Sequence, residues 1–255
     1  MNYNAALYAL GAILLGAVGI WFGEFAMQWQ AVPKWIPPMP FAYLSGALMI
    51  TGGALMLARR ERIGAALLAS FYGLWVLAFH LPPTLTKAIG SIGAWNAPAE
   101  STFLAVGGLA LFASYAGDSG AKLRVLSRVL AGASAVVFGF AHFNYIDFTA
   151  SFVPAWIPPS QTFWAWATGA GHLAAGIALI TGVQARLAAT CLASMMGAFV
   201  VLLHIPRVIA APGQHVEWIM VAIASALCGS ALLIRKYATQ REGFAASLAA
   251  WGMRT

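Results

Sequence analysis

Val32–Pro38 reads V-P-K-W-I-P-P, and Val153–Pro159 reads V-P-A-W-I-P-P. The two phrases agree at six of seven positions and begin 121 residues apart, close to half of the 255-residue chain. Each proline lacks an N–H donor and restrains its predecessor to extended geometry, so neither phrase forms a regular helix. Both lie between long apolar segments. We therefore expect two stiff, tryptophan-bearing caps outside pairs of membrane helices, in a duplicated chain whose function lies where its halves face one another.

The composition indicates a membrane protein, with 61% hydrophobic and 8% charged residues where soluble domains carry about 25% charged residues. Eight apolar runs approach the roughly 20 residues that span a bilayer. They predict an all-α membrane protein with eight transmembrane helices in two parallel-repeat four-helix bundles, because four helices per half give both halves the same orientation. The repeats would cover residues 1–117 and 125–255, joined by a cytoplasmic linker at 118–124. The predicted spans are Asn4–Met27, Phe41–Ala58, Arg62–Leu81, Ala99–Gly117, Val125–Ile146, Gln161–Gly182, Arg186–Pro206 and Val216–Lys236.

The basic residues divide unevenly between the two sides of this topology. Eleven fall on one side: Arg59, Arg60, Arg62, Lys122, Arg124, Arg128, Arg186, Arg235, Lys236, Arg241 and Arg254. Three fall on the other: Lys34, Lys87 and Arg207. The positive-inside rule then predicts a multi-pass protein of the bacterial inner membrane with both termini in the cytoplasm. The net charge of +7 is thereby explained by topology and contact with the lipid bilayer, and we expect no nucleic-acid partner.

Two histidines end the third and seventh predicted helices in His-x-Pro turns, His80 and His204. In a two-fold bundle they could meet near the axis and ligate a haem or hydrogen-bond a quinone. The alternative is that each caps the last carbonyls of its helix. Glu100 and Glu217 begin the fourth and eighth helices, where a carboxylate stabilises the helix dipole. Alternatively, both carboxylates hold the histidine pair in one tautomer.

His142 and His172 lie deeper in the predicted helices. His172 is 11 residues into the sixth helix, roughly 16 Å from its start, and an ionisable group at such depth is a functional candidate. A neutral histidine bonded to a neighbouring helix is the alternative. Glu24 and His142 occupy similar places in the first and fifth helices. They are candidates for a salt bridge or a proton-handling pair across the interface of the halves.

Trp35 and Trp156 of the two W-I-P-P phrases belong to a group of tryptophans at the outer interface. Such a group is typical of the aromatic belt of membrane proteins. The alternative is an aromatic lid over an apolar pocket suited to a quinone or a lipid. The sequence contains no phosphate-binding loop, nucleophile elbow or zinc-protease helix, so it gives no support to the chemistry of soluble enzymes.

The repeated unit resembles the DoxX-like family of small bacterial membrane proteins. The resemblance rests on an apolar first helix, an outer V-P-x-W-I-P-P loop, a Gly-rich second helix and a third helix that ends in a polar-Pro turn. His142-Phe143 and Trp156–Pro159 carry it in the second half, whereas the first half keeps Trp35–Pro38 without a matching His-Phe. The resemblance implies an integral four-helix bundle and, because some relatives are associated with quinone-linked sulfur oxidation or oxidative-stress complexes, a redox setting.

Two functional hypotheses follow from the sequence. The first is a redox-associated membrane protein that binds quinone or haem in the outer half of the bundle through His80 and His204. Glu24, His142 and His172 would then handle protons, and subunits of a redox complex are possible partners. The second is a non-enzymatic subunit or assembly factor that docks a partner complex through its Gly-rich helices.

Overall fold

The computed structural model describes residues 3–25, 33 and 35–237, and these residues form helices joined by short turns. The predicted all-α class is confirmed for this part of the chain. Buried apolar helices are expected here, because a helix satisfies its own backbone hydrogen bonds without water. The long helices are α1 (Tyr3–Phe22), α2 (Pro38–Leu57), α3 (Glu61–Trp75), α5 (Ile92–Ala113), α6 (Gly120–Asn144), α8 (Gln161–Thr181), α9 (Ala185–Ala198) and α11 (His215–Tyr237). The short ones are α4 (Leu81–Lys87), α7 (Ile146–Phe152) and α10 (Ile205–Ala210), with η1 (Val76–His80), η2 (Gly117–Ser119) and η3 (Phe199–His204) between helices.

Seven helices among the described residues are long and apolar enough to cross a membrane. They coincide with seven of the eight predicted spans, although the end of the first predicted span, to Met27, lies outside the described residues. Helix α5, which contains most of the fourth predicted span, Ala99–Gly117, is not among the seven. Its 22 residues are long enough, but Asn96, Glu100, Ser101 and Thr102 make its first turns polar.

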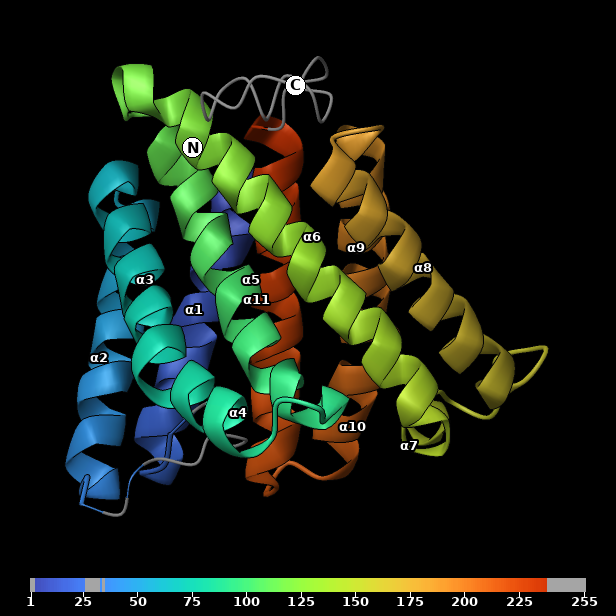
Figure 1. Ribbon diagram of the computed structural model, residues 1–255. Coiled ribbons are helices and arrows are strands. Elements are labelled where there is room, and N and C mark those ends of the chain that lie inside the picture. The colour runs from blue at the N-terminus through green and yellow to red at the C-terminus, as the bar shows by residue number, and fades with distance from the viewer. Residues whose placement is uncertain (1–2, 26–32, 34, 238–255) are drawn as a thin grey trace.

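The long helices pack in two groups around a central pair, α5 and α11 (Figure 1). On one side α1 packs against α2 and α11, and α3 lies between α2 and α5. On the other side α6 packs against α8 and α5, and α9 lies between α8 and α11. The central helices are thereby covered from both sides, and α11 is the most thoroughly buried of the candidate spans.

Glycine faces allow the helices of each group to approach closely, as the sequence predicts. A Cβ atom added to Gly46 of α2 would lie 2.6 Å from the carbonyl oxygen of Gly16 in α1. In the other group, a Cβ atom on Gly176 of α8 would lie 2.8 Å from the carbonyl oxygen of Gly132 in α6. Small residues at such crossings bring two backbones into van der Waals contact, which is the main attraction between helices in lipid.

The helices that lead to the two His-x-Pro turns do not end there. The chain passes through the π-helical segments η1 and η3, which end at His80 and His204, and continues as α4 to Lys87 and as α10 to Ala210. The prediction that these helices end at the histidines is therefore wrong. A proline is tolerated in the first turn of a new helical segment, where no N–H donor is needed.

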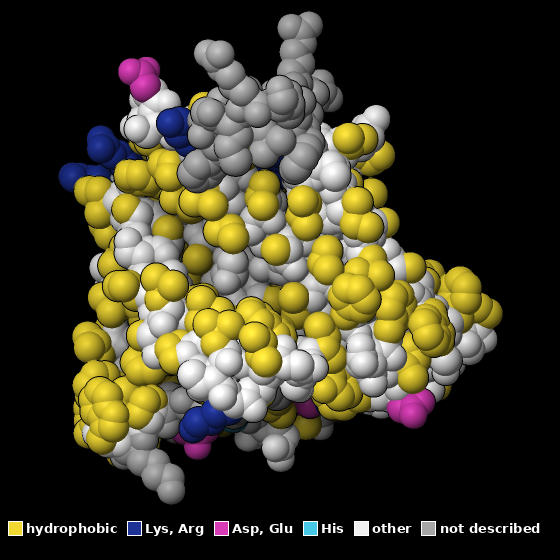
Figure 2. Space-filling view, in the orientation of Figure 1, with side chains coloured by type: hydrophobic (Ala, Val, Ile, Leu, Met, Phe, Trp, Pro, Cys, Tyr) yellow, Lys and Arg dark blue, Asp and Glu magenta, His cyan; other side chains and the backbone are white. Residues whose placement is uncertain are grey.

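The two ends of the bundle differ in character. The turns with Trp35 and Trp156 lie at one end, which we call the tryptophan end, and α2 begins there at Pro38. At the opposite, basic end lie the turn from Arg59 to Glu61, the start of α6 and the end of α11. Figure 2 shows the Lys and Arg side chains of this face gathered mainly at its upper end, above a flank of hydrophobic side chains. Lys34, Arg241 and Arg254 lie outside the described residues.

The connection between α5 and α6 lies earlier in the chain than the predicted linker at 118–124. Residues 114–119, which include η2, separate the two helices, and α6 already begins at Gly120 and includes Lys122 and Arg124. Arg128, one turn further on, is buried and donates to the carbonyl oxygens of Leu179 and Ile180 at the end of α8. A cation at that place stabilises the negative end of a helix, so Arg128 also ties α6 to α8.

Candidate functional site

His80 and His204 lie in different packing environments. His80 is buried, and its Nε2 lies 3.0 Å from the hydroxyl of Ser101 in α5. His204 is also buried, beside α11, and its Nδ1 has no hydrogen-bond partner among the described residues. No ring contact joins the two histidines in the described part of the chain, so the predicted pairing near the axis finds no contact that supports it.

His142 and His172 form the closest histidine pair in the described residues. Their ring centroids are 4.9 Å apart with a tilt of 38°, although the residues come from different helices, α6 and α8. His172 is 3% exposed. Its ring meets the edge of Phe138 at 5.7 Å and stacks on Phe199 at 6.4 Å. The pair therefore lies in an aromatic environment between α6, α8 and the beginning of η3.

The backbone fixes the tautomer of both rings. His142 Nδ1 is 2.8 Å from the carbonyl oxygen of Phe138, and His172 Nδ1 is 2.9 Å from that of Thr168. A carbonyl oxygen only accepts, so Nδ1 carries the proton in each ring. The Nε2 atom of each neutral ring then has a lone pair and acts as a hydrogen-bond acceptor. Histidines that bind a ligand through Nε2 are commonly oriented in this way.

The packing of α6 on α8 explains how the two rings meet. A Cβ atom on Gly169 would lie 3.0 Å from Cβ of His142, and one on Gly139 would lie 2.9 Å from the carbonyl oxygen of Gly169. The two glycines thus bring the backbones together directly beside the histidines. His172 is one turn after Gly169, so it follows on the same face of α8.

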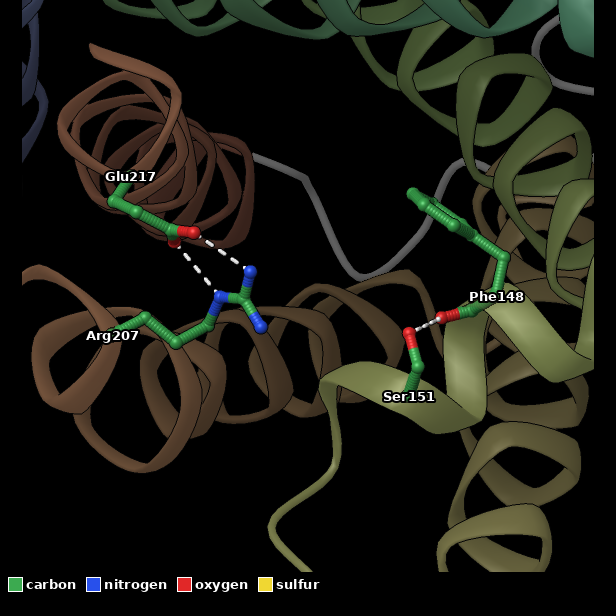
Figure 3. A network of polar contacts seen from close by, with 4 residues as sticks. All are labelled: Phe148, Ser151, Arg207 and Glu217. Atoms are coloured by element: carbon green, nitrogen blue, oxygen red, sulfur yellow. Dashed lines mark hydrogen bonds and ion pairs between the residues drawn. The ribbon is translucent and has the colours of Figure 1, made fainter. Parts of the chain in front are cut away.

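A second polar cluster lies at the tryptophan end, where α10 meets α11 (Figure 3). Arg207 of α10 donates from Nε and Nη2 to the two carboxylate oxygens of Glu217, at 2.8 and 2.7 Å. Its guanidinium also lies 4.5 Å from the ring centre of Phe152 in α7. Ser151 of the same short helix donates to the carbonyl oxygen of Phe148 at 2.6 Å. Arg207 therefore links α7, α10 and α11, and Glu217 is committed to this ion pair.

Glu24 pairs with His215 instead of His142. The Glu24 carboxylate is 2.9 Å from His215 Nδ1, and the His215 ring stacks on Phe22 with centroids 4.3 Å apart. His215 is the first residue of α11. Glu100, the other predicted carboxylate, has Asn96 of its own helix as its recorded partner, at 3.5 Å.

The tryptophans of the W-I-P-P turns lie on the surface. The exposed fractions are 78% for Trp35 and 72% for Trp156. Exposure at the end of a membrane helix bundle is what an aromatic belt requires. Among the described residues, neither Trp35 nor Trp156 makes a ring contact with His142 or His172. The predicted aromatic lid therefore has no contact that supports it.

Sequence reasoning missed two unpaired donors inside the first group of helices. The hydroxyl of Tyr72 and the Nε1 of Trp75, both in α3, are buried and have no hydrogen-bond partner in the described part of the chain. It also assigned no role to Arg207 beyond topology. Lone aromatic and basic residues in an apolar helix leave no spacing pattern. A polar atom without a partner can be recognised only from the packed structure.

Comparison with known proteins gives one positive result. Residues 123–205 match the model of the DoxX family. This segment runs from α6 through η3 and contains both His142 and His172. The predicted DoxX likeness is confirmed for this segment of the second half, which is similar to DoxX proteins. No curated protein and no solved structure matches the chain.

Proposed function

We propose that this protein is a multi-pass, redox-associated protein of the bacterial inner membrane that binds the hydroxyl-bearing ring of a reduced quinone beside α6 and α8. The observation that carries the proposal is the pair His142 and His172, whose rings are 4.9 Å apart and whose Nδ1 atoms both donate to carbonyl oxygens of their own helices. An ionisable pair of this kind inside a membrane bundle is a functional site by default.

The chemistry of the pair selects the ligand. With Nδ1 protonated, each Nε2 accepts a hydrogen bond, so the partner must be an O–H or N–H donor. A quinol carries two hydroxyl groups on an apolar ring, whereas an oxidised quinone offers only acceptors. Phe138 and Phe199 supply the apolar and aromatic walls that such a ring requires.

The same geometry argues against a haem ligated by two histidines. Two axial nitrogens stand about 4 Å apart across the iron, at roughly 2 Å for each bond, which puts the ring centroids more than about 6 Å apart with the porphyrin between them. His142 and His172 are closer than that. His80 and His204 have no recorded ring contact in the described residues. The donor set therefore fits a quinol better than a haem.

We also propose that the chain is a tandem duplication with eight spans, in which α5 crosses the membrane in addition to the seven candidate spans. Four contacts of the first half recur in the second half when both residue numbers are raised by 123. They are Gly16–Gly46 and Gly139–Gly169, Ala9–Gly53 and Gly132–Gly176, Thr84–Ala94 and Arg207–Glu217, and Ile89–Trp95 and Pro212–Trp218. At the centre, Gly107 of α5 contacts Ser230 of α11, and these residues are themselves 123 apart. Contact between equivalent positions supports a two-fold axis through the central pair.

In this register the histidine site belongs to the second half alone. The counterparts of His142 and His172, 123 residues earlier, are Gly19 and Met49. The halves therefore share a backbone arrangement but differ in the chemistry that they present. The excess of basic residues at the basic end supports an orientation with that end in the cytoplasm, which places the tryptophan end on the outer side.

The test is binding of a decyl-substituted benzoquinol to the protein in lipid nanodiscs under anaerobic conditions, measured against empty nanodiscs. We expect His172→Met, which restores the residue of the first half, to weaken binding roughly tenfold, because one charge-free hydrogen bond is lost. His204→Leu is the matched control, since it removes a buried histidine outside the pair. Unchanged quinol affinity in His172→Met would refute the site. A stable co-purifying membrane partner without quinol binding would favour the docking role.

A further inference from the structure

We propose that the first half holds a second ligand site of opposite polarity, in which the Tyr72 hydroxyl and the Trp75 indole N–H donate to a carbonyl oxygen of an apolar ligand. Both groups are buried and have no hydrogen-bond partner among the described residues, and Tyr72 is 0% exposed. They are three residues apart on α3, so they lie on the same face of the helix. Tyr72 belongs to the apolar core, and Trp75 is partly buried against it.

The depth of these donors makes their lack of a partner costly. Tyr72 is 11 residues beyond the start of α3 at Glu61, roughly 16 Å from the basic end and so close to the middle of a bilayer about 30 Å thick. A buried donor without a partner destabilises the ligand-free protein, and the hydrocarbon core offers no water to satisfy it. A bound acceptor removes this cost for both groups.

The surroundings of the donors are aromatic. The Trp75 ring lies 5.2 Å from Phe25, 5.5 Å from Phe71 and 4.8 Å from Phe79. Tyr8 of α1 is not available as a further donor, because it gives its proton to the carbonyl oxygen of Leu104 at 2.8 Å. The site therefore presents two donors within apolar walls. That combination suits a flat apolar molecule with a carbonyl group and no hydrogen-bond donor of its own.

The site is confined to the first half in the same way as the histidine pair is confined to the second. The positions 123 residues after Tyr72 and Trp75 are Met195 and Ala198, which have no N–H or O–H group in their side chains. The first half thus offers donors and the second half acceptors. The two proposals rest on different residues, so each can fail without the other.

Two kinds of apolar molecule carry a carbonyl group of this type, an oxidised quinone in its ring and a lipid in its ester. The test uses one probe of each kind, a decyl-substituted benzoquinone and methyl decanoate, with the full-length protein in nanodiscs. We expect Tyr72→Phe and Trp75→Phe each to lower the affinity for the bound probe by about fivefold to tenfold, the effect of one hydrogen bond. Dependence on Tyr72 for the benzoquinone identifies a quinone site, and dependence for the ester alone identifies a lipid site.

Two controls separate this site from other effects. Trp218→Phe removes an indole N–H that already has a partner, the carbonyl oxygen of Pro212 at 2.8 Å, and should leave the affinity for both probes unchanged. His172→Met should also leave them unchanged. Tyr72→Phe should not reduce the stability of the ligand-free protein, because it deletes an unpaired hydroxyl. If neither probe binds, or if both α3 variants bind the probes as the wild type does, the proposal is overturned.

Discussion

The close approach of α6 and α8 brings the rings of His142 and His172 together, and adding one methyl group at Gly176 tests how much this approach contributes to stability. In Gly176→Ala the new Cβ atom would lie 2.7 Å from Cγ2 of Val136 and 2.8 Å from the carbonyl oxygen of Gly132. Both distances are shorter than van der Waals contact, and one of the atoms belongs to the backbone. Overpacking of this kind costs about 1–3 kcal/mol. Replacing glycine by alanine inside a helix returns up to about 1 kcal/mol.

The net expectation is a loss of up to about 2 kcal/mol in the free energy of unfolding. Gly171→Ala is the matched control on the same helix, because its Cβ atom would meet only Sδ of Met195, at 3.5 Å. It keeps the gain in helix propensity without the clash, so its stability should rise by up to about 1 kcal/mol. Gly53→Ala, the counterpart of Gly176→Ala in the first half, should lose stability to a similar extent, since its Cβ atom would lie 2.6 Å from the carbonyl oxygen of Ala9.

The assay is equilibrium unfolding in mixed micelles with increasing dodecyl sulfate, followed by circular dichroism. The three variants and the wild type are compared at one protein and lipid concentration. Opposite shifts for Gly176→Ala and Gly171→Ala would establish that the close approach of α6 and α8 holds the second half together. Identical midpoints for these two variants would refute the reasoning, because the helix-propensity term is common to both.

Three further predictions concern the outer turns, the interior and the orientation. In the first, the double variant Arg207→Thr with Glu217→Ala introduces the residues of the first half and should be less destabilising than Glu217→Ala alone. The single change leaves Arg207 without the carboxylate that it contacts at 2.7 Å. A double-mutant cycle by chemical unfolding measures the difference, and additive losses would contradict the prediction. Tyr8→Phe should lower the free energy of unfolding by about 1–3 kcal/mol, because the carbonyl oxygen of Leu104 loses its buried donor, as the same unfolding titration would reveal. In whole cells, a membrane-impermeant thiol reagent should label Ser160→Cys but not Ser119→Cys in a background without the native cysteines; the reverse pattern would invert the proposed orientation.

Much of the fold could be predicted from the sequence, because the bilayer imposes length and hydropathy on every span. The two W-I-P-P phrases also marked turns at the tryptophan end correctly, since proline excludes a regular helix whatever the tertiary context. The continuation of the helices beyond His80 and His204 was not predictable by the same rule. There the chain inserts a π-helical segment, and the proline then falls in the first turn of a new helix, where it is harmless.

The partners of the polar side chains were harder to predict than the spans. His142 and His172 were both recognised as candidates, but nothing in their local sequence states that they face one another. Their contact depends on the rotation of α6 against α8, which the glycines at the crossing fix. The pairing of Glu24 with His215, 191 residues apart, depends likewise on the packing of α1 against α11. Charge spacing along one helix carries no information on such contacts.

Under the proposed duplication, the two proposed sites bear on why the halves would diverge in this pattern. Residues that hold the helices together, such as Gly53 and Gly176, are the same in both halves, because a change there would cost packing. Residues inside each half are free to change once the partner half supplies the original chemistry. Met49 is the counterpart of His172 in the register of the repeat, and Met195 is the counterpart of Tyr72. Each half thus has an apolar residue where the other has a polar one, so a ligand that donates and a ligand that accepts would occupy opposite sides of the central helices α5 and α11. The two proposals thus set one site within each half, separated by the central pair, against the hypothesis of a single site where the halves meet.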